Sequence, residues 1–293
     1  MSRSYKKLSI GDIFFDSLNI IFMLCISFAT LYPFLYILSQ SLGGSALTSL
    51  GLIPKNISFS AYEKVLTTDF VINGFYNTII RTVLGTILTL LFTICTAYPL
   101  SKRYFPNRSF WTGFIVFTMF FSGGLIPSYL LVRGLHLNNT VWSLVLPGLI
   151  GSFNMIIMRN FFMSIPESME ESAKIDGAND IVILFFIVVP TSLSIIATIF
   201  LWAAVGHWNA WFDCLIYITE PTKHVLQLIL RRVVIEGTTK FMNLDNTYND
   251  NYAVSTEAVK SATIMVTTMP IILLYPFVQK YFVKGIMIGS LKG

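Results

Sequence analysis

The densest group of carboxylates in this sequence lies between two long apolar segments. It reads ESMEESAKIDGAND and contains Glu167, Glu170 and Glu171. Carboxylates of this kind accept charge-assisted hydrogen bonds from the Arg and Lys side chains of another protein. They equally suit a solvated helix that only connects its neighbours. The residues alone leave both interpretations open.

Motifs for catalysis or cofactor binding are absent from the sequence. It contains no GxxxxGK[ST] phosphate loop, no GxSxG or HExxH motif and no CxxC pair. Its three cysteines, Cys25, Cys95 and Cys214, are far apart. We therefore expect this chain to bind no cofactor and no metal, and to have no catalytic residue.

The composition is that of a membrane protein. Hydrophobic residues make up 54% of the 293-residue chain, charged residues make up 12%, and the mean hydropathy is +0.69. Soluble domains carry about 25% charged residues. The net charge of +5 is typical of basic loops on the cytoplasmic side of a membrane rather than of nucleic-acid binding.

The apolar residues are grouped into segments long enough to cross a bilayer, which takes about 20 residues in a helix. We predict an all-α integral membrane protein. Its transmembrane domain covers residues 17–283, between an N-terminal tail, 1–16, and a C-terminal tail, 284–293. The expected spans are 17–38, 75–100, 110–132, 141–162, 181–205 and 264–283.

The distribution of Lys and Arg predicts the orientation. Both tails and the loop 101–109 are basic, with Lys102, Arg103 and Arg108 in that loop. Basic loops stay in the cytoplasm. With six spans, the acidic loop 164–180 lies on the same side, so we expect both termini and this loop to be cytoplasmic.

The acidic loop has the features of a short capped helix. Ser164 and Glu167 have the spacing of a capping box, and Pro166 suits the first turn. Gly177 stands where a helix would end, because Gly accepts a positive φ. We predict a helix over residues 166–176 that lies along the cytoplasmic face of the membrane.

Charge within the predicted spans is scarce. Apart from Lys280, which we count with the basic C-terminal tail, only Arg81 and Arg159 fall inside them, each near a span end, where we expect the side chain to reach back to the interface. No Asp or Glu lies deep in a span, although proton- and sodium-driven pumps usually carry one. The energy for any transport must therefore come from elsewhere.

The spacing in and after the acidic loop resembles the EAA motif of bacterial ABC importer permeases. That motif is Glu-Ala-Ala, three residues, Gly, nine residues, Ile, one residue and Leu-Pro. Here it begins at Glu171 and ends at Pro190, with Gly177 and Ile187 at the expected distances. Ser172 replaces the first Ala, and Val189 replaces the Leu.

Two further stretches are similar to the carbohydrate-type permeases, the branch that includes the smaller permease subunit of the maltose importer. These are the C-terminus, QKYFVKGIMIGSLKG, and the run WNAWF that starts at Trp208. The stretch GGLIPSYLLVRGLHLNNTVWSLVLPG resembles permeases for polysaccharide-derived oligosaccharides, including the alginate importer. The resemblance implies a six-helix bundle of the type I ABC importer fold with a cytoplasmic coupling helix.

The resemblance also implies partners. The chain would pair with a second, homologous permease, with two ATPase subunits that carry ATP and Mg²⁺, and with an extracytoplasmic solute-binding protein, in the inner membrane of a bacterium. The implied ATPase contacts are Glu171, Ser172, Ala173, Asp176, Gly177, Ala178 and Pro190 in and after the loop, and Lys284, Gly285 and Lys292 in the C-terminal tail.

Substrate and binding-protein contacts are expected on the outer side. Aromatic side chains stack on sugars but also form interfacial belts. Candidates for the substrate pathway are Trp142, Trp202, Trp208, Asn209 and Trp211, and for the binding protein Asn243, Asp245 and Tyr248. The expected function is the permease of an ATP-driven oligosaccharide importer, with an acidic substrate such as alginate. The alternatives are a secondary transporter or channel, and a membrane-embedded enzyme.

Overall fold

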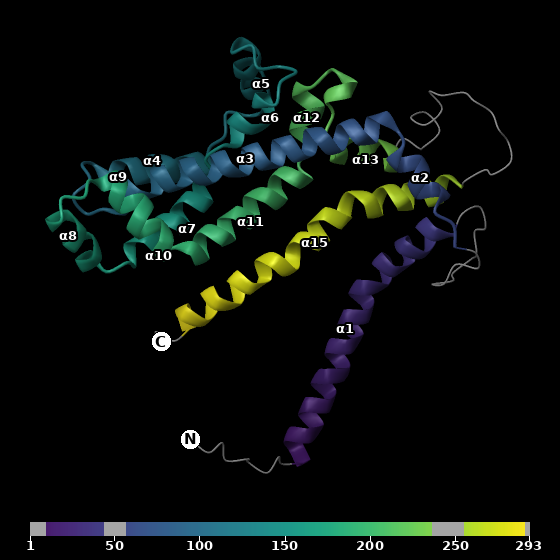
Figure 1. Ribbon diagram of the computed structural model, residues 1–293, viewed down its shortest axis with the longest axis horizontal. Coiled ribbons are helices and arrows are strands. Elements are labelled where there is room, and N and C mark those ends of the chain that lie inside the picture. The colour runs from purple at the N-terminus through teal and green to yellow at the C-terminus, as the bar shows by residue number, and fades with distance from the viewer. Residues whose placement is uncertain (1–9, 44–56, 236–254, 291–293) are drawn as a thin grey trace. The chain divides into compact units, whose positions relative to one another are not determined.

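The structure is a computed structural model that describes residues 10–43, 57–235 and 255–290. Every regular element in these residues is a helix, so the predicted all-α fold is confirmed. The chain divides into two compact units. The first contains α1 (Ile10–Leu42), α2 (Ser60–Leu66) and the start of α15 (Thr256–Ser290) (Figure 1).

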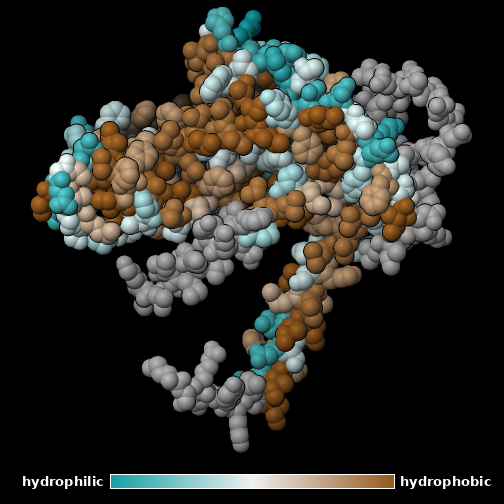
Figure 2. Space-filling view, in the orientation of Figure 1, coloured by the Kyte–Doolittle hydropathy of each residue, from teal (hydrophilic) through white to brown (hydrophobic). Residues whose placement is uncertain are grey.

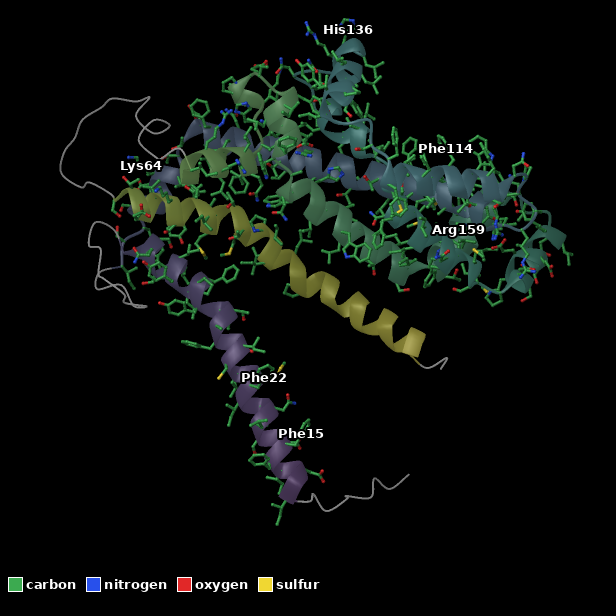
Figure 3. All side chains as sticks on the ribbon, turned by 180° about the vertical axis from the view of Figure 1, so that it is seen from behind. Phe15, Phe22, Lys64, Phe114, His136 and Arg159 are labelled. Atoms are coloured by element: carbon green, nitrogen blue, oxygen red, sulfur yellow. The ribbon has the colours of Figure 1, made fainter. Side chains whose placement is uncertain are left out.

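Helix α1 of the first unit is mostly apolar. An 18-residue stretch of it has a mean hydropathy of 2.1, and Phe15 and Phe22 point away from the helix into open space (Figure 3). Figure 2 shows hydrophobic surface along α1 and over the helices of the second unit. Apolar surface of this extent marks contact with lipid or with another protein. Ser41 and Tyr62 join α1 to α2 through their hydroxyls, 2.7 Å apart.

The second unit is built around α3 (Asp69–Ser101), which packs against α7 (Ser152–Met163), α11 (Leu193–Asn209) and α13 (Leu226–Ile235). A core of fully buried side chains, including Met155, Met158, Phe162, Ile183 and Ile199, lies along α3 and reaches the acidic helix. This packing places the end of α3 beside the acidic segment.

The remaining helices of the second unit are short. They are α4 (Arg108–Phe120), α5 (Leu125–Gly134), α6 (Trp142–Val145), η1 (Leu146–Gly148), α8 (Glu167–Ile175), α9 (Asp180–Ile183), η2 (Leu184–Val188), α10 (Val189–Thr191), α12 (Phe212–Tyr217) and η3 (Pro221–Lys223).

Three described helices are each long and apolar enough to cross a membrane: α1, α3 and the Thr256–Leu274 part of α15. The other three predicted spans are helix pairs, bent by 112° between α4 and α5, 53° between η1 and α7, and 85° between α10 and α11. Gly124, with φ +89°, allows the sharpest bend, because this φ is open to Gly and rare for other residues.

Candidate functional site

The predicted acidic helix exists as α8, Glu167–Ile175. The predicted capping box is wrong. The Ser164 hydroxyl donates to the Phe161 carbonyl, 2.7 Å away, and Ser164 is the C-cap of α7. Pro166, with ψ 127°, is the N-cap of α8 instead. The Glu167 carboxylate lies 3.5 Å from Arg103, so Ser164 and Glu167 serve different helices.

Gly177 ends α8 as predicted, with φ +83°. Its N–H donates to the Lys174 carbonyl, and the N–H of Ala178 donates to the Ala173 carbonyl, 2.9 Å away. This pair of bonds is the Schellman motif, which satisfies the last carbonyls of a helix. Asn179 then caps α9 by accepting from the Val182 N–H at 2.9 Å. The connection from α8 to α9 is therefore short and closed by hydrogen bonds.

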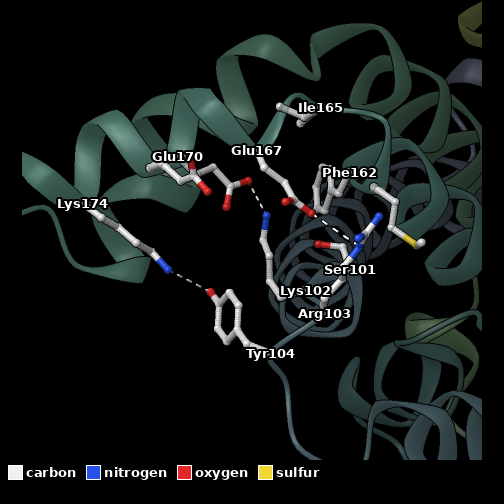
Figure 4. Close-up of a pocket in the computed structure, with 11 residues that line it drawn as sticks. Ser101, Lys102, Arg103, Tyr104, Phe162, Ile165, Glu167, Glu170 and Lys174 are labelled. Atoms are coloured by element: carbon white, nitrogen blue, oxygen red, sulfur yellow. Dashed lines mark hydrogen bonds and ion pairs between the residues drawn. The ribbon is translucent and has the colours of Figure 1, made fainter.

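A charged contact ties α8 to the end of α3. The Lys102 ammonium forms an ion pair with the Glu170 carboxylate, and it also lies 4.5 Å from the centroid of the Tyr98 ring (Figure 4). The two paired side chains are only 12% and 10% exposed. Sequence reasoning assigned Lys102 to the basic cytoplasmic loop alone, because nothing local in the sequence couples it to Glu170.

Tyr104 adds a second, exposed tie. Lys174 donates to its hydroxyl at 3.3 Å, and the hydroxyl donates to Asp180 at 3.2 Å. The hydrogen bond to Tyr104, aided by Asp180, raises the pKa of Lys174. The residues 102–104 thus contact α8 at its start, middle and end, and we call them the α3 clasp.

An open pocket of about 360 Å³ lies between α8 and the α3 clasp. Three glutamates and Lys174 line it from α8, and Lys102, Arg103 and Tyr104 line it from the clasp (Figure 4). Glu171 lines it, is exposed, and has no hydrogen-bond or ion-pair partner among the described residues. Ser172 and Asp176 are exposed as well. The free carboxylate of Glu171 is the group on α8 that remains open to a basic partner.

The other residues of the motif contribute to the chain's own packing. Ala173 is 9% exposed and Ala178 packs against the same core. Pro190 lies in α10, directly after five residues of π-helix. Proline has no N–H and cannot make the usual helical hydrogen bond, and the π-helical turn before it accommodates this missing bond. Ala173 therefore faces this chain's own core rather than a surface that a partner reaches.

Arg81 does not reach the interface as the sequence predicted. Its side chain is 2% exposed and pairs with Asp213. It also donates to the carbonyls of Ala210, at 3.0 Å, and Leu144, at 3.4 Å. Acceptors from two segments, residues 210–213 and Leu144, compensate the buried charge. By contrast, Arg159 is partly exposed and donates to the Leu100 carbonyl at 2.8 Å.

The candidate pathway residues do not form one group. Trp142 begins α6, and Trp202 stacks on Phe153 with ring centroids 6.0 Å apart. Trp208 is buried and donates to the Thr267 carbonyl at 3.1 Å, so packing accounts for it. Asn209 and Trp211 lie beside α13, which supplies two polar contacts to them.

Several predicted contacts lie outside what the structure describes. Lys284 and Gly285 are on α15, but their side chains are not described. Lys292 and the three predicted binding-protein contacts, Asn243, Asp245 and Tyr248, lie entirely outside the described residues.

Comparison with known proteins gives the family. Residues 104–288 match the sequence profile of the binding-protein-dependent transport system inner membrane component. Protein LplC of Bacillus subtilis is 42% identical over 283 residues, which is 95% of each chain. The polygalacturonan/rhamnogalacturonan transport system permease protein YtcP of the same organism is 38% identical over 282 residues, covering 95% of this chain and 98% of YtcP.

A solved structure agrees with these relatives. It is a chain in the crystal structure of a bacterial ABC transporter involved in the import of the acidic polysaccharide alginate. Its TM-score to this chain is 0.86 at 33% identity, covering 94% of this chain and 99% of that one. The chain therefore belongs to the binding-protein-dependent transport system inner membrane components, the permeases of ABC importers, rather than to the secondary transporters, channels or membrane enzymes.

Proposed function

We propose that this chain is a permease subunit of an ATP-driven importer of acidic oligosaccharides derived from polysaccharides. The observation that carries the proposal is the likeness, over nearly the whole chain, to a transporter of the acidic polysaccharide alginate. The relative YtcP, named for polygalacturonan and rhamnogalacturonan transport, supports it. The chemistry common to these named polymers is a sugar ring that bears a carboxylate.

In this proposal the chain performs no catalysis itself. It pairs with a second, related permease, and two partner subunits bind ATP and Mg²⁺ and hydrolyse the nucleotide. An external solute-binding protein delivers the sugar, as the family description implies. The complex lies in the bacterial cytoplasmic membrane, with both tails and α8 on the cytoplasmic side, as the basic loops favour.

The coupling element of the proposal is α8. The exposed carboxylate of Glu171 receives a basic side chain of an ATPase subunit, and Lys284, Gly285 and Lys292 of the C-terminal tail add a second contact. When the ATPase dimer closes, α8 moves as a rigid piece. The α3 clasp transmits this motion to α3, and the turn at Gly177 transmits it to α9. A loaded binding protein favours the outward state only if it binds that state better.

The test replaces Glu171 with Lys in the complete complex, reconstituted in proteoliposomes with its ATPases and binding protein. We expect the protein to assemble in the membrane and uptake to be lost, because two like charges then meet at the contact. Glu63→Lys, an equal charge change at an exposed residue of α2 and outside α8, is the control and should import normally. Normal uptake by Glu171→Lys would refute the docking role.

A panel of labelled acidic and neutral oligosaccharides tests the substrate class. We expect the wild-type complex to import oligogalacturonates or other uronate oligomers in preference to neutral oligomers of the same length. Preference for the neutral series would refute the acidic substrate and leave the permease assignment intact.

A further inference from the structure

Helix α13 has a buried apolar face and a polar face. One face, with Leu226, Ile229 and Val233, is buried. It packs so closely on α3 that a Cβ at Gly74 would lie 2.6 Å from Ile229 Cδ1. The other face presents Gln227 and Arg231, four residues apart and therefore one turn apart on the same side. The close packing fixes where these two polar side chains lie.

Gln227 and Arg231 both contact the segment that follows α11. The Arg231 guanidinium carbon lies 3.7 Å from the centroid of the Trp211 ring. Gln227 Nε2 donates to Asn209 Oδ1, 3.4 Å away. The carbonyl of Ala210, between these two residues, accepts from buried Arg81 at 3.0 Å. The segment 209–211 is therefore also held by Arg81 of α3. Its contacts with α13 are positioned by the packing of these helices.

The charge of Arg231 is not compensated within the described residues. Arg231 is exposed, and it has no ion pair there. Among the described residues, the two carboxylates nearest to Arg231 in the sequence are engaged elsewhere, Asp213 with Arg81 and Glu220 with Lys223 at 2.6 Å. A guanidinium that stacks on an aromatic ring keeps its in-plane N–H donors free for a planar anion.

We propose that Asn209, Gln227 and Arg231 form a recognition site for a uronate ring of the incoming oligosaccharide. The Arg231 guanidinium binds the sugar carboxylate, and the two amides bind ring hydroxyls. Trp211 positions the guanidinium and does not itself bind the sugar. This inference rests on the proposed function, because it names the residues that select the acidic substrate class.

The experiment uses the complete reconstituted complex and labelled trigalacturonate. Arg231→Gln removes the charge and keeps a polar side chain. We expect about tenfold lower uptake or more, because a hydrogen-bonded contact between charges is lost. ATP hydrolysis stimulated by the loaded binding protein should stay at the wild-type rate. Arg231→Lys keeps the charge but loses the planar guanidinium. Its rate of uptake should lie between those of the wild type and Arg231→Gln.

The control is Arg232→Gln, an equal charge change at the next residue, which contacts His224 instead. It should import trigalacturonate at a rate close to that of the wild type. A normal rate for Arg231→Gln would overturn the inference, as would an equal loss of uptake and stimulated ATP hydrolysis, which indicates a structural role. Failure of the wild-type complex to import trigalacturonate or any other uronate oligomer would instead refute the acidic substrate class itself.

Discussion

The Lys102 ammonium and the Glu170 carboxylate form an ion pair that joins the end of α3 to the middle of α8, with side chains only 12% and 10% exposed. Exposed ion pairs contribute about 0–1 kcal/mol. A pair withdrawn from water behaves differently, because removal of one partner leaves the other charge uncompensated. The pair therefore fixes the position of α8 relative to α3.

Reversal of one charge in this pair should uncouple the transporter. We expect Glu170→Lys to lose most uptake while the loaded complex still hydrolyses ATP, because two cations then repel at the α3–α8 contact. The charge-swapped double variant Lys102→Glu/Glu170→Lys should recover uptake. The measurement is sugar imported per ATP hydrolysed in proteoliposomes.

The matched control for that swap is the neighbouring pair Arg103 and Glu167, whose side chains are 87% and 72% exposed. Glu167→Lys should change uptake little, because the exposed pair is weak. If Glu170→Lys also imports normally, α8 does not depend on its tie to α3.

Substitution of Gly177 should reduce uptake according to how poorly the new residue tolerates a positive φ. A Cβ at this position meets no atom within 4 Å, so any loss comes from the backbone and not from a clash. We expect Gly177→Val to reduce uptake strongly and Gly177→Asn to retain most of it, because Asn tolerates the left-handed conformation that costs other residues about 1–2 kcal/mol. Equal uptake by both variants would contradict this account. Membrane abundance and uptake are measured together.

Removal of Arg81 should destabilise the second unit. Arg81→Met leaves the Asp213 carboxylate without its partner, and we expect a loss of about 3 kcal/mol in unfolding free energy. The double variant Arg81→Met/Asp213→Asn should regain part of the lost unfolding free energy, because no unpaired charge then remains. Thermal unfolding of the purified complex measures the difference. Arg159→Gln, which loses a bond to one carbonyl, should cost about 1 kcal/mol. Equal destabilisation by Arg81→Met and Arg159→Gln would contradict the role of the pair.

The segment that carries α13 should lose stability in acid. Burial, and then the nearby Arg232, lower the pKa of His224 below its ordinary value of 6.5, and a hydrogen bond to the Ile218 backbone opposes this only in part. The unfolded segment therefore binds a proton more readily than the folded one. Stability is complete above pH 6.5 and falls as the pH drops below it.

Amide hydrogen exchange of residues 212–235 at pH 7.5 and pH 5.5, corrected for the intrinsic rates, measures this effect. We expect faster opening at the lower pH in the wild type and a smaller difference in His224→Gln, which has no ionisable ring. An unchanged pH dependence in His224→Gln would assign the effect to other groups.

The sequence by itself determined the features that depend on local chemistry. The apolar segments predicted the helices, because each contains enough hydrophobic residues to form a span. Gly177 predicted the end of α8, because the positive φ of a Schellman turn is a property of one residue. The spacing from Glu171 to Pro190 identified the family, which the comparisons confirmed. The coupling role of that spacing stays a prediction.

Local rules failed where two elements compete for the same residue. Ser164 had the spacing of an N-cap for α8, but it ends α7, because only three residues separate the two helices. The 112° bend between α4 and α5 also escaped hydropathy, which averages over a window and does not register the conformation of Gly124.

Only the tertiary structure decided which charges meet. Arg81 and Asp213 are 132 residues apart in the sequence, and Lys102 and Glu170 are 68 apart. The contacts of α13 with Asn209 and Trp211 likewise join separate helices. Such pairs form because helix packing brings distant segments together. Burial of each charge is costly unless this packing also supplies its partner. The sequence supplies these side chains, and the fold determines their partners.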